Sequence, residues 1–282
     1  MLVVICSNKF NKYCEKWFDI ANKNKNFQFI LINDDERLCI ENNFLLNNLT
    51  IVNNSKNIGK IKSIIKYILD NYINDWIMAL DDKDVLLNEN LDQSLFKSSL
   101  KDSELIYVSD TMSINKNIIG NEFIDKSTLK NFYINKGKIG DKVIIFNSKD
   151  ILENREEYEK FLSYPCKIYE TALFSKYFDK KAIKIDPLVI HPYNKDGITC
   201  NNLNNKLENY QFYLWETEYY LNNRPSFNVL ISRLFILWFL RKKGTINLKP
   251  LHKFLYKFIE ILGLFPLIKK IYLYKLKKVI NN

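Results

Sequence analysis

Glycine, proline and histidine are scarce in this chain: its 282 residues include 7 Gly, 6 Pro and 2 His. No glycine-rich loop of the kind that cradles phosphates in P-loop enzymes is present. The five cysteines are odd in number and form no CxxC pair. A disulfide framework or a zinc cluster is therefore not expected, and a reducing cytoplasm suits the chain best.

Long apolar runs are also missing. The stretch 2–6, LVVIC, follows no basic leader and is too short for the core of a signal peptide, so we interpret it as the first strand of the fold. The apolar stretch 228–240 has thirteen residues, whereas a helix needs about 20 to cross a bilayer. Hydrophobic residues still make up 47% of the sequence, enough for one substantial core and a smaller appendage. The plentiful aromatic residues (17 Tyr, 19 Phe and 4 Trp) exclude a disordered chain.

Charge is unevenly distributed along the chain, which carries +10 overall. Residues 224–282 contain thirteen Lys or Arg and a single acid, Glu260, for a net charge of +12, so residues 1–223 carry about −2. We therefore predict a near-neutral body followed by a strongly basic region. Such an asymmetry favours a polyanionic partner, either a nucleic acid or an anionic membrane surface.

A short apolar stretch, Trp76–Leu80, ends in three carboxylates, Asp81, Asp82 and Asp84. Carboxylates so close together repel one another and raise one another's pKa, so folding alone gives little reason to keep them. A hard divalent cation, Mg²⁺ or Mn²⁺, is the usual occupant of such a cluster and shares its charge with phosphate oxygens. The alternative is a helix N-cap or a solvated turn after a strand, where Asp is also favoured.

The first part of the chain, to about residue 110, alternates between strand and helix patterns. The expected strands are 2–6, 27–32, 49–52, 76–80 and 105–108, and the expected helices are 12–22 and 58–72. This alternation predicts an α/β fold with a mostly parallel, Rossmann-like sheet flanked by helices.

Polar residues follow three of these strands: Ser7-Asn8, Asp34-Asp35 and Asp81-Asp82. In a parallel sheet the carboxyl ends of the strands meet at one edge, where α/β proteins bind ligands. We therefore expect these side chains to gather at one edge. Acids at strand ends also serve as helix caps, which is the structural alternative.

The order of these segments resembles the GT-A glycosyltransferases, most closely glycosyltransferase family 2, over roughly residues 1–200. The segments that carry the similarity are Val4–Asn8 at the first strand, Ile32–Asp35 at the second, Asn57–Lys60 opening a helix, Trp76–Asp84 in place of the DxD metal motif, and Glu104–Asp110 as the acid-tipped strand that follows. The segment Asp196–Thr199, shortly after His191-Pro192-Tyr193, is similar to a late loop of that family.

The resemblance implies transfer of a sugar from a nucleoside-diphosphate donor, with UDP the expected nucleotide, to a hydroxyl of a glycan or lipid-linked acceptor, with inversion at the anomeric carbon. The residues implied to bind the donor are Ser7, Asn8, Asp34, Asp35, Asn57, Lys60, Asp81 and Asp82. Asp82 and Asp84 are implied to hold Mn²⁺ or Mg²⁺, and Glu170 to act as the general base. The role that the family suggests is bacterial surface polysaccharide assembly, as in a capsule or lipopolysaccharide.

The metal motif departs from the family pattern. Lys83 stands where a metal-binding acid is common, so Asp82 or Asp84 must take that role, or metal dependence is weaker. A lysine can itself neutralise phosphate as a point charge. His191 is a candidate metal ligand, although a lone His before Pro is more often a loop or core residue.

The base motif departs as well. Tyr169-Glu170-Thr171 lacks the Asp of the family's Glu-Asp pair. The alternative for Glu170 is a first-turn acid that interacts favourably with the helix dipole. Asp141 and Asp186 are reserve candidates for the base.

The basic C-terminal region is expected to form amphipathic helices. We predict a catalytic domain at 1–203 and a helical region at 204–282. Aromatic-rich apolar faces flanked by lysines are typical of helices that lie on membranes, and each Lys or Arg near an anionic leaflet adds roughly 1 kcal/mol. We therefore predict a cytoplasmic enzyme held peripherally at the inner face of the plasma membrane through 224–282. The alternative is packing of these helices on the catalytic body or on a second subunit of an oligomer.

Two other functions are compatible with parts of the sequence. The basic region suggests a nucleic-acid-binding protein, but no zinc, helix-turn-helix or RNP pattern accompanies it, and no nucleic acid is expected. The acidic motif suggests a nucleotidyltransferase or phosphohydrolase. A DxDx[TV] nucleophile is not formed, however, because Leu86 stands where Thr or Val is needed after Asp82 and Asp84.

Overall fold

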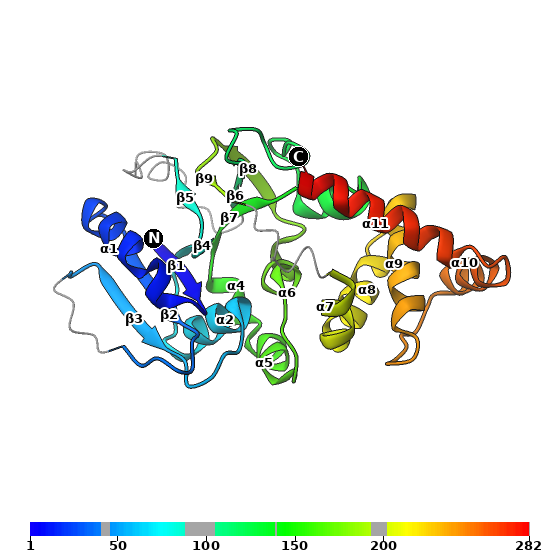
Figure 1. Ribbon diagram of the computed structural model, residues 1–282, viewed down its shortest axis with the longest axis horizontal. Coiled ribbons are helices and arrows are strands. Elements are labelled where there is room, and N and C mark those ends of the chain that lie inside the picture. The colour runs from blue at the N-terminus through cyan, green and yellow to red at the C-terminus, as the bar shows by residue number, and fades with distance from the viewer. Residues whose placement is uncertain (41–45, 88–104, 139, 193–201, 282) are drawn as a thin grey trace.

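The computed structural model describes residues 1–40, 46–87, 105–138, 140–192 and 202–281. Within these ranges the chain forms a seven-stranded sheet with helices packed against it, and further helices extend from it at the C-terminal end (Figure 1). The α/β fold class predicted from the sequence is thereby confirmed.

The large sheet is parallel in one half and mixed in the other. Its strand order is β3(Leu49–Asn53), β2(Gln28–Asn33), β1(Leu2–Ser7), β4(Trp76–Asp81), β7(Lys142–Asn147), β6(Leu105–Asp110) and β8(Lys181–Ile185). The first four strands are parallel, β7 is antiparallel to both of its neighbours, and β6 and β8 are parallel. A second, two-stranded antiparallel sheet is formed by β5(Val85–Leu86) and β9(Val189–Ile190).

Helices follow the strands in the body of the protein and dominate the C-terminal region. The body contains α1(Phe10–Lys23), α2(Lys60–Asp70), the π-helix η1(Lys130–Asn135), α4(Lys149–Glu153), α5(Arg155–Ser163), α6(Glu170–Phe174) and the 3₁₀ turn η2(Ser175–Tyr177). The C-terminal region contains α7(Asn202–Glu208), α8(Tyr210–Asn222), α9(Phe227–Leu240), α10(Pro250–Ile261) and α11(Phe265–Asn281).

The sheet has a hydrophobic core on each face because successive side chains of a strand point to opposite sides. In β1, Val4 belongs to one apolar cluster and Val3 to the other. Helix α2 packs its Ile61–Leu69 stripe into the first cluster, and α1 packs Trp17 and Ala21 into the second. Both faces of the parallel half are therefore covered, as expected for continuous apolar strands.

The predicted strands and helices of the first 110 residues are all present, with bounds shifted by a few residues. The helix predicted to begin at Ile58 begins at Lys60, because Gly59 before it adopts a φ of +88°. Strands β7 and β8 were not predicted. The predicted late loop, Tyr193 and Asp196–Thr199, lies outside the described residues.

The C-terminal helices continue the core of the body. Buried residues of α8 and α9, such as Phe212 and Phe235, belong to the same apolar cluster as Val4 of the sheet. Helix α11 packs back on α9, as Figure 1 shows in red and orange. The boundary between residues 203 and 204 stays a prediction. None of the described helices has the length and apolar character needed to span a membrane.

Candidate active site

The polar strand ends lie at one edge of the sheet, as predicted. Strand β1 pairs with β2 on one side and β4 on the other, so that Cys6 is opposite both Ile32 and Asp81. The residues that follow Ile32, including Asp34, therefore emerge on the same edge as Asp81, and the Asp34 N–H donates to the Ser7 carbonyl (2.8 Å).

A recess opens at this edge where the sheet divides. The ladder between β4 and β7 covers Trp76–Met78 and Ile145–Asn147, and within the described residues it goes no further. Beyond it the two strands separate, and the residues of β4 and β7 that no longer pair line a cavity of about 60 Å³. The lining of this first recess includes Ala79, Asp81, Lys142, Val143 and Ile144, together with Lys60, Asp84, Asp141, Glu170 and His191.

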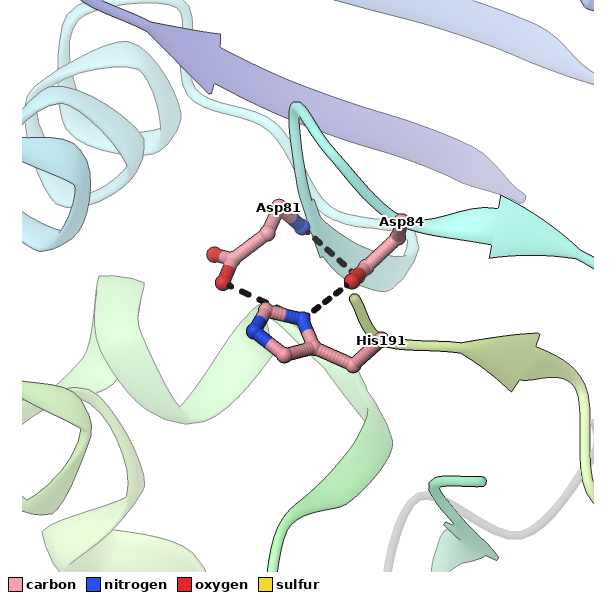
Figure 2. A group of neighbouring side chains, drawn as sticks. All are labelled: Asp81, Asp84 and His191. Atoms are coloured by element: carbon pink, nitrogen blue, oxygen red, sulfur yellow. Dashed lines mark hydrogen bonds and ion pairs between the residues drawn. The ribbon is translucent and has the colours of Figure 1, made fainter. Parts of the chain in front are cut away.

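Asp81, Asp84 and His191 form a compact cluster in the first recess (Figure 2). One ligand atom from each lies within 4.8 Å of the others. The His191 Nδ1 is 2.6 Å from one Asp84 oxygen and 3.8 Å from Asp81. The other Asp84 oxygen accepts the Asp81 N–H (2.9 Å), which fixes the turn after β4.

The small sheet explains why His191 reaches this cluster. Val85 of β5 pairs with Ile190 of β9 in an antiparallel ladder. The next pair outward is Asp84 and His191, so two residues that are 107 positions apart face each other. Burial opposes the charged imidazole, but the hydrogen bond and charge of Asp84 outweigh it and raise the pKa of His191.

Lys60 places a positive charge against the same cluster. Its ammonium forms an ion pair with Asp81. Burial alone opposes ionisation of both groups, but their mutual attraction outweighs it, so the pKa of Lys60 is raised and that of Asp81 is lowered. The first recess therefore combines charged carboxylates with a cation, a pattern suited to binding a diphosphate.

The cluster fits a hard divalent cation. Two carboxylates and an imidazole nitrogen supply ligand types that Mn²⁺ and Mg²⁺ accept, with the imidazole favouring Mn²⁺. Asp84 was predicted as a ligand and lies in the cluster. Asp82, the other predicted ligand, is not among its residues.

Asp82 instead holds the turn to neighbouring elements. Its carboxylate accepts the Ser7 hydroxyl (2.5 Å), and its main-chain carbonyl accepts Lys16 Nζ (2.7 Å) and Trp17 Nε1 (3.0 Å) of α1. Burial raises the pKa of Asp82. Lys16 also donates to the Asp84 carbonyl (2.8 Å), so two side chains of α1 hold the acidic turn in place.

The Asp34 carboxylate accepts hydrogen bonds from a loop of the protein itself. Its buried carboxylate accepts the Asn54 side chain (2.9 Å), the N–H groups of Ile58 (3.1 Å) and Gly59 (2.9 Å), and the Ser63 hydroxyl (3.3 Å). These bonds hold the loop that leads into α2 and so position Lys60. The predicted role of Asp34 in binding the donor stays a prediction.

The remaining predicted donor residues lie around the same edge but do not line the first recess. Asp35 is paired with Arg37 through two hydrogen bonds (2.9 and 3.0 Å). Asn8 and Asn57 are exposed in the loops after β1 and before α2. Asp186, a reserve candidate for the base, is exposed after β8, and its carbonyl accepts the Ser109 hydroxyl (3.0 Å).

Glu170 stands at the first turn of α6, where two cavities meet. It lines the first recess with Asp81 and Asp84. It also lines a second cavity of about 210 Å³ that extends away from the acidic turn. Glu170 and Asp141 belong to the wall that the two cavities share. A carboxylate in this position can reach groups bound on either side.

Asp141 reaches the shared wall because β7 runs in reverse. A parallel strand delivers the residue after it to this edge, whereas the antiparallel β7 delivers the residue before it. Asp141 is an exposed residue, yet desolvation by the surrounding protein raises its pKa to about 6, with the carboxylates of Asp81, Asp84 and Glu170 acting in the same direction and His191 opposing them. Asp141 was only a reserve candidate from the sequence.

Two groups of the site were missed by the sequence analysis. Neither Lys16 nor Lys142 was singled out from the sequence. Lys142 lines both cavities and forms an ion pair with Asp110 (3.0 Å) in which both side chains are fully buried. In the sequence, Asp110 is only an acid at the end of one strand and Lys142 only a lysine at the start of another. Neither position indicates that the two side chains pair.

No family model matches the chain, and no curated protein matches it. Its structure is similar to that of the 1–349 fragment of S. aureus TarS in complex with UDP-GlcNAc, with a TM-score of 0.46 and 14% identity over 86% of this chain and 82% of that one. It is also similar to GalNAc-T7 with UDP, GalNAc and Mn²⁺, with a TM-score of 0.42 and 11% identity over 70% of this chain and 43% of that one. The glycosyltransferase GlyE of Streptococcus pneumoniae TIGR4 gives a TM-score of 0.37 and 12% identity over 65% of this chain and 44% of that one. These values mark distant similarities.

Proposed function

We propose that this protein is a GT-A-type glycosyltransferase that moves a sugar from a nucleoside diphosphate, with UDP the expected nucleotide, to an acceptor hydroxyl. The observation that carries the proposal is the shared wall of the two cavities. A carboxylate, Glu170, separates a recess suited to a diphosphate from a second cavity large enough for another substrate. Transfer between two bound molecules needs this arrangement, whereas hydrolysis needs only water on the second side.

On the donor side, Asp81, Asp84 and His191 are the residues suited to holding Mn²⁺ or Mg²⁺. Such an ion, when bound, offsets the negative charge that develops on the departing diphosphate. Lys60 lies beside Asp81 and can neutralise a further phosphate oxygen. Asp34 supports this role indirectly, because it fixes the loop that leads into α2, where Lys60 is the first residue.

On the acceptor side, Glu170 is the proposed general base. The acceptor oxygen forms a bond to the anomeric carbon while the bond from that carbon to the diphosphate oxygen breaks, and its electron pair leaves with the nucleotide. The hydroxyl proton passes to a Glu170 oxygen. A base on the side opposite the leaving group favours attack from the opposite face, hence inversion.

A thermal-shift panel tests the donor proposal. We expect one class of nucleotide sugar, UDP-sugars first, to raise the melting temperature in the presence of Mn²⁺ by more than Mn²⁺ or the nucleotide sugar alone, because a ligand that binds only the folded state stabilises it by RT ln(1 + [L]/Kd). Inorganic phosphate is the control for general anion binding. If UDP-, GDP-, dTDP- and CMP-sugars all leave the melting temperature unchanged, the proposal is wrong.

We further propose that α10 and α11 dock the protein on an anionic membrane surface, where a lipid-linked acceptor of surface polysaccharide assembly would be presented. Ten of the fifteen exposed large hydrophobic side chains in the described part of the chain lie in these two helices or in the short link between them: Leu251, Phe254, Phe258, Ile261, Leu262, Leu264, Leu267, Ile271, Leu273 and Tyr274. Such a concentration is unusual for a surface that faces only water.

The spacing and charge of these helices support a lipid partner. Four exposed residues of α10 recur at positions 251, 254, 258 and 261, and the same spacing is repeated at 264, just before α11, and at 267, 271 and 274 within it. Spacings of three and four place each set on one side of its helix. Residues 224–282 carry a net +12, which complements an anionic leaflet.

Vesicle flotation tests the docking proposal with the full-length protein. Removal of residues 224–282 is unsuitable as a test, because it would also remove Arg233 of α9 and leave its buried partner Glu216 without a cation. We expect recovery with vesicles that contain phosphatidylglycerol and little with pure phosphatidylcholine. Phe254→Ser with Ile261→Ser should lower recovery at least tenfold, since each buried apolar side chain contributes about 1.5–3 kcal/mol.

The matched control is Tyr72→Ser with Ile114→Ser. These two side chains are about as exposed, at 73% and 67%, as Phe254 and Ile261 at 70% and 81%, but they lie outside the C-terminal helices. The control variant should float like the wild type. Equal recovery of the wild type in the soluble fraction with both vesicle types would rule out docking.

A further inference from the structure

The second cavity lies between the body and the C-terminal helices. It encloses about 210 Å³. Cavities that hold drug-sized molecules are typically about 300–1,000 Å³, so this one suits a smaller group, such as a single sugar ring. Its walls include residues of η1, β7 and α6, together with Phe178, which follows η2, and Tyr220 of α8. The C-terminal region thus contributes directly to the cavity.

The walls of the cavity combine apolar and aromatic side chains with polar ones. The ring and aliphatic side chains are Leu129, Tyr133, Ile144, Phe174, Phe178 and Tyr220. Carbohydrate rings carry C–H groups on their faces and hydroxyls at their rims, so they fit a site that combines aromatic walls with a few polar groups. The polar groups of the lining include carboxylates and hydroxyls, which accept hydrogen bonds from sugar hydroxyls.

The charge of the cavity is negative. Asp141 and Glu170 line it, and among the lining residues that the structure describes the one ammonium belongs to Lys142. That ammonium is already paired with Asp110 at 3.0 Å, and both side chains are fully buried. A negatively charged group in the cavity would therefore meet two carboxylates, and the described part of the lining offers it no ammonium other than the paired Lys142.

A buried network holds the Tyr220 wall in place. The Arg233 guanidinium lies 3.8 Å from the centre of the Tyr220 ring and donates to Glu216 (2.5 Å). The other Glu216 oxygen accepts the hydroxyl of Thr171 (2.5 Å), the residue after Glu170. Glu216 is 7% exposed. The network fixes one wall of the cavity relative to the carboxylates and so defines which groups fit between them.

We infer that this cavity binds the acceptor's sugar residue, and that it selects neutral or amino-bearing rings over acidic ones. The inference rests on the proposed glycosyltransferase function and specifies the substrate class of its acceptor side. A neutral ring can pack against the aromatic side chains of the cavity without electrostatic repulsion. An ammonium gains the attraction of Asp141 and Glu170, whereas a uronate carboxylate is repelled by both.

Direct binding of model glycosides tests the inference without turnover. Methyl glucoside, methyl glucosaminide and methyl glucuronide are titrated by saturation-transfer NMR into the full-length protein with UDP and Mn²⁺. We expect the first two to bind in the millimolar range and the glucuronide to bind at least tenfold more weakly. Asp141→Asn, which keeps the size of the side chain, should raise the relative affinity for the glucuronide severalfold.

Tyr220→Ala should weaken binding of the neutral glycoside at least tenfold, whereas Tyr72→Ala, at an exposed tyrosine outside the cavity, should not. Equal affinity for all three glycosides, no binding of any, or an unchanged preference in the Asp141→Asn variant would overturn the inference. A positive thermal shift with a nucleotide sugar alongside such a result would leave the donor proposal intact. If only the donor proposal is wrong, the glycosides should bind while nucleotide sugars leave the melting temperature unchanged.

Discussion

Replacing Glu170 with Gln should lower the transfer rate at least 100-fold while the affinity for UDP changes little. The substitution keeps the size and hydrogen-bonding reach of the side chain but removes its ability to take a proton. General base catalysis contributes typically about 10²–10⁴-fold to a rate. Glu170 also lines the donor recess, but the ion pair and acidic cluster there are formed by other residues, Lys60, Asp81 and Asp84. The measurement is transfer from a labelled nucleotide sugar, with UDP affinity from calorimetry.

Two further variants make this result interpretable. Glu157→Gln removes an acid of α5 that is paired with Lys176 away from both cavities, and it should transfer like the wild type. Asp141→Asn tests the other carboxylate of the shared wall. Near-normal turnover in the Glu170→Gln variant, with collapse in the Asp141→Asn variant, would transfer the role of base to Asp141.

The second large effect is expected at Asp84. In the Asp84→Asn variant, the Mn²⁺ concentration needed for half-maximal activity should rise at least tenfold, and kcat/KM should fall about 100-fold. The amide loses the charge that attracts the ion, and it also weakens the contact that orients His191 (2.6 Å). Asp82→Asn should change the Mn²⁺ requirement less than threefold, because an amide oxygen can still accept the Ser7 hydroxyl.

The two variants are compared after chelation and stepwise return of Mn²⁺ or Mg²⁺, with thermal unfolding as a check on folding. They differ in position by two residues and share the same chemical change, so each serves as the control for the other. A larger Mn²⁺ effect in Asp82→Asn than in Asp84→Asn would assign the ion to Asp82 instead. Full activity without any divalent ion would leave Lys60 as the cation of the donor recess.

Much of the sheet could be predicted because its strands are buried on both faces. A strand such as β4 must then be apolar along its length, and the polar residue that ends it marks the edge of the sheet. The gathering of Ser7, Asp34 and Asp81 at one edge followed from that rule. The direction of β7 did not, because an apolar run such as 142–147 has the same pattern in either direction.

The details of the site depended on contacts that no local pattern records. His191 meets Asp84 only through the two-residue strands β5 and β9, which are too short to be recognised in a sequence. Asp34 had the same signal as Asp81, an acid after a buried strand. The difference is that the Asn54–Gly59 loop returns to Asp34 and occupies its oxygens with N–H donors, and a loop's path is not encoded in periodicity.

The short ladder between β4 and β7 has a consequence for how this protein could change over time. Paired strands lie about 4.8 Å apart, which leaves no room for a ligand between them. The depth of the first recess is therefore set by the point at which pairing stops, after Met78 and Ile145. Extending the pairing by one or two residues would seal the recess with backbone even if every acidic side chain were kept. Whether this chain can hold a ligand here thus depends first on how far the main chains of β4 and β7 pair, and only then on the side chains.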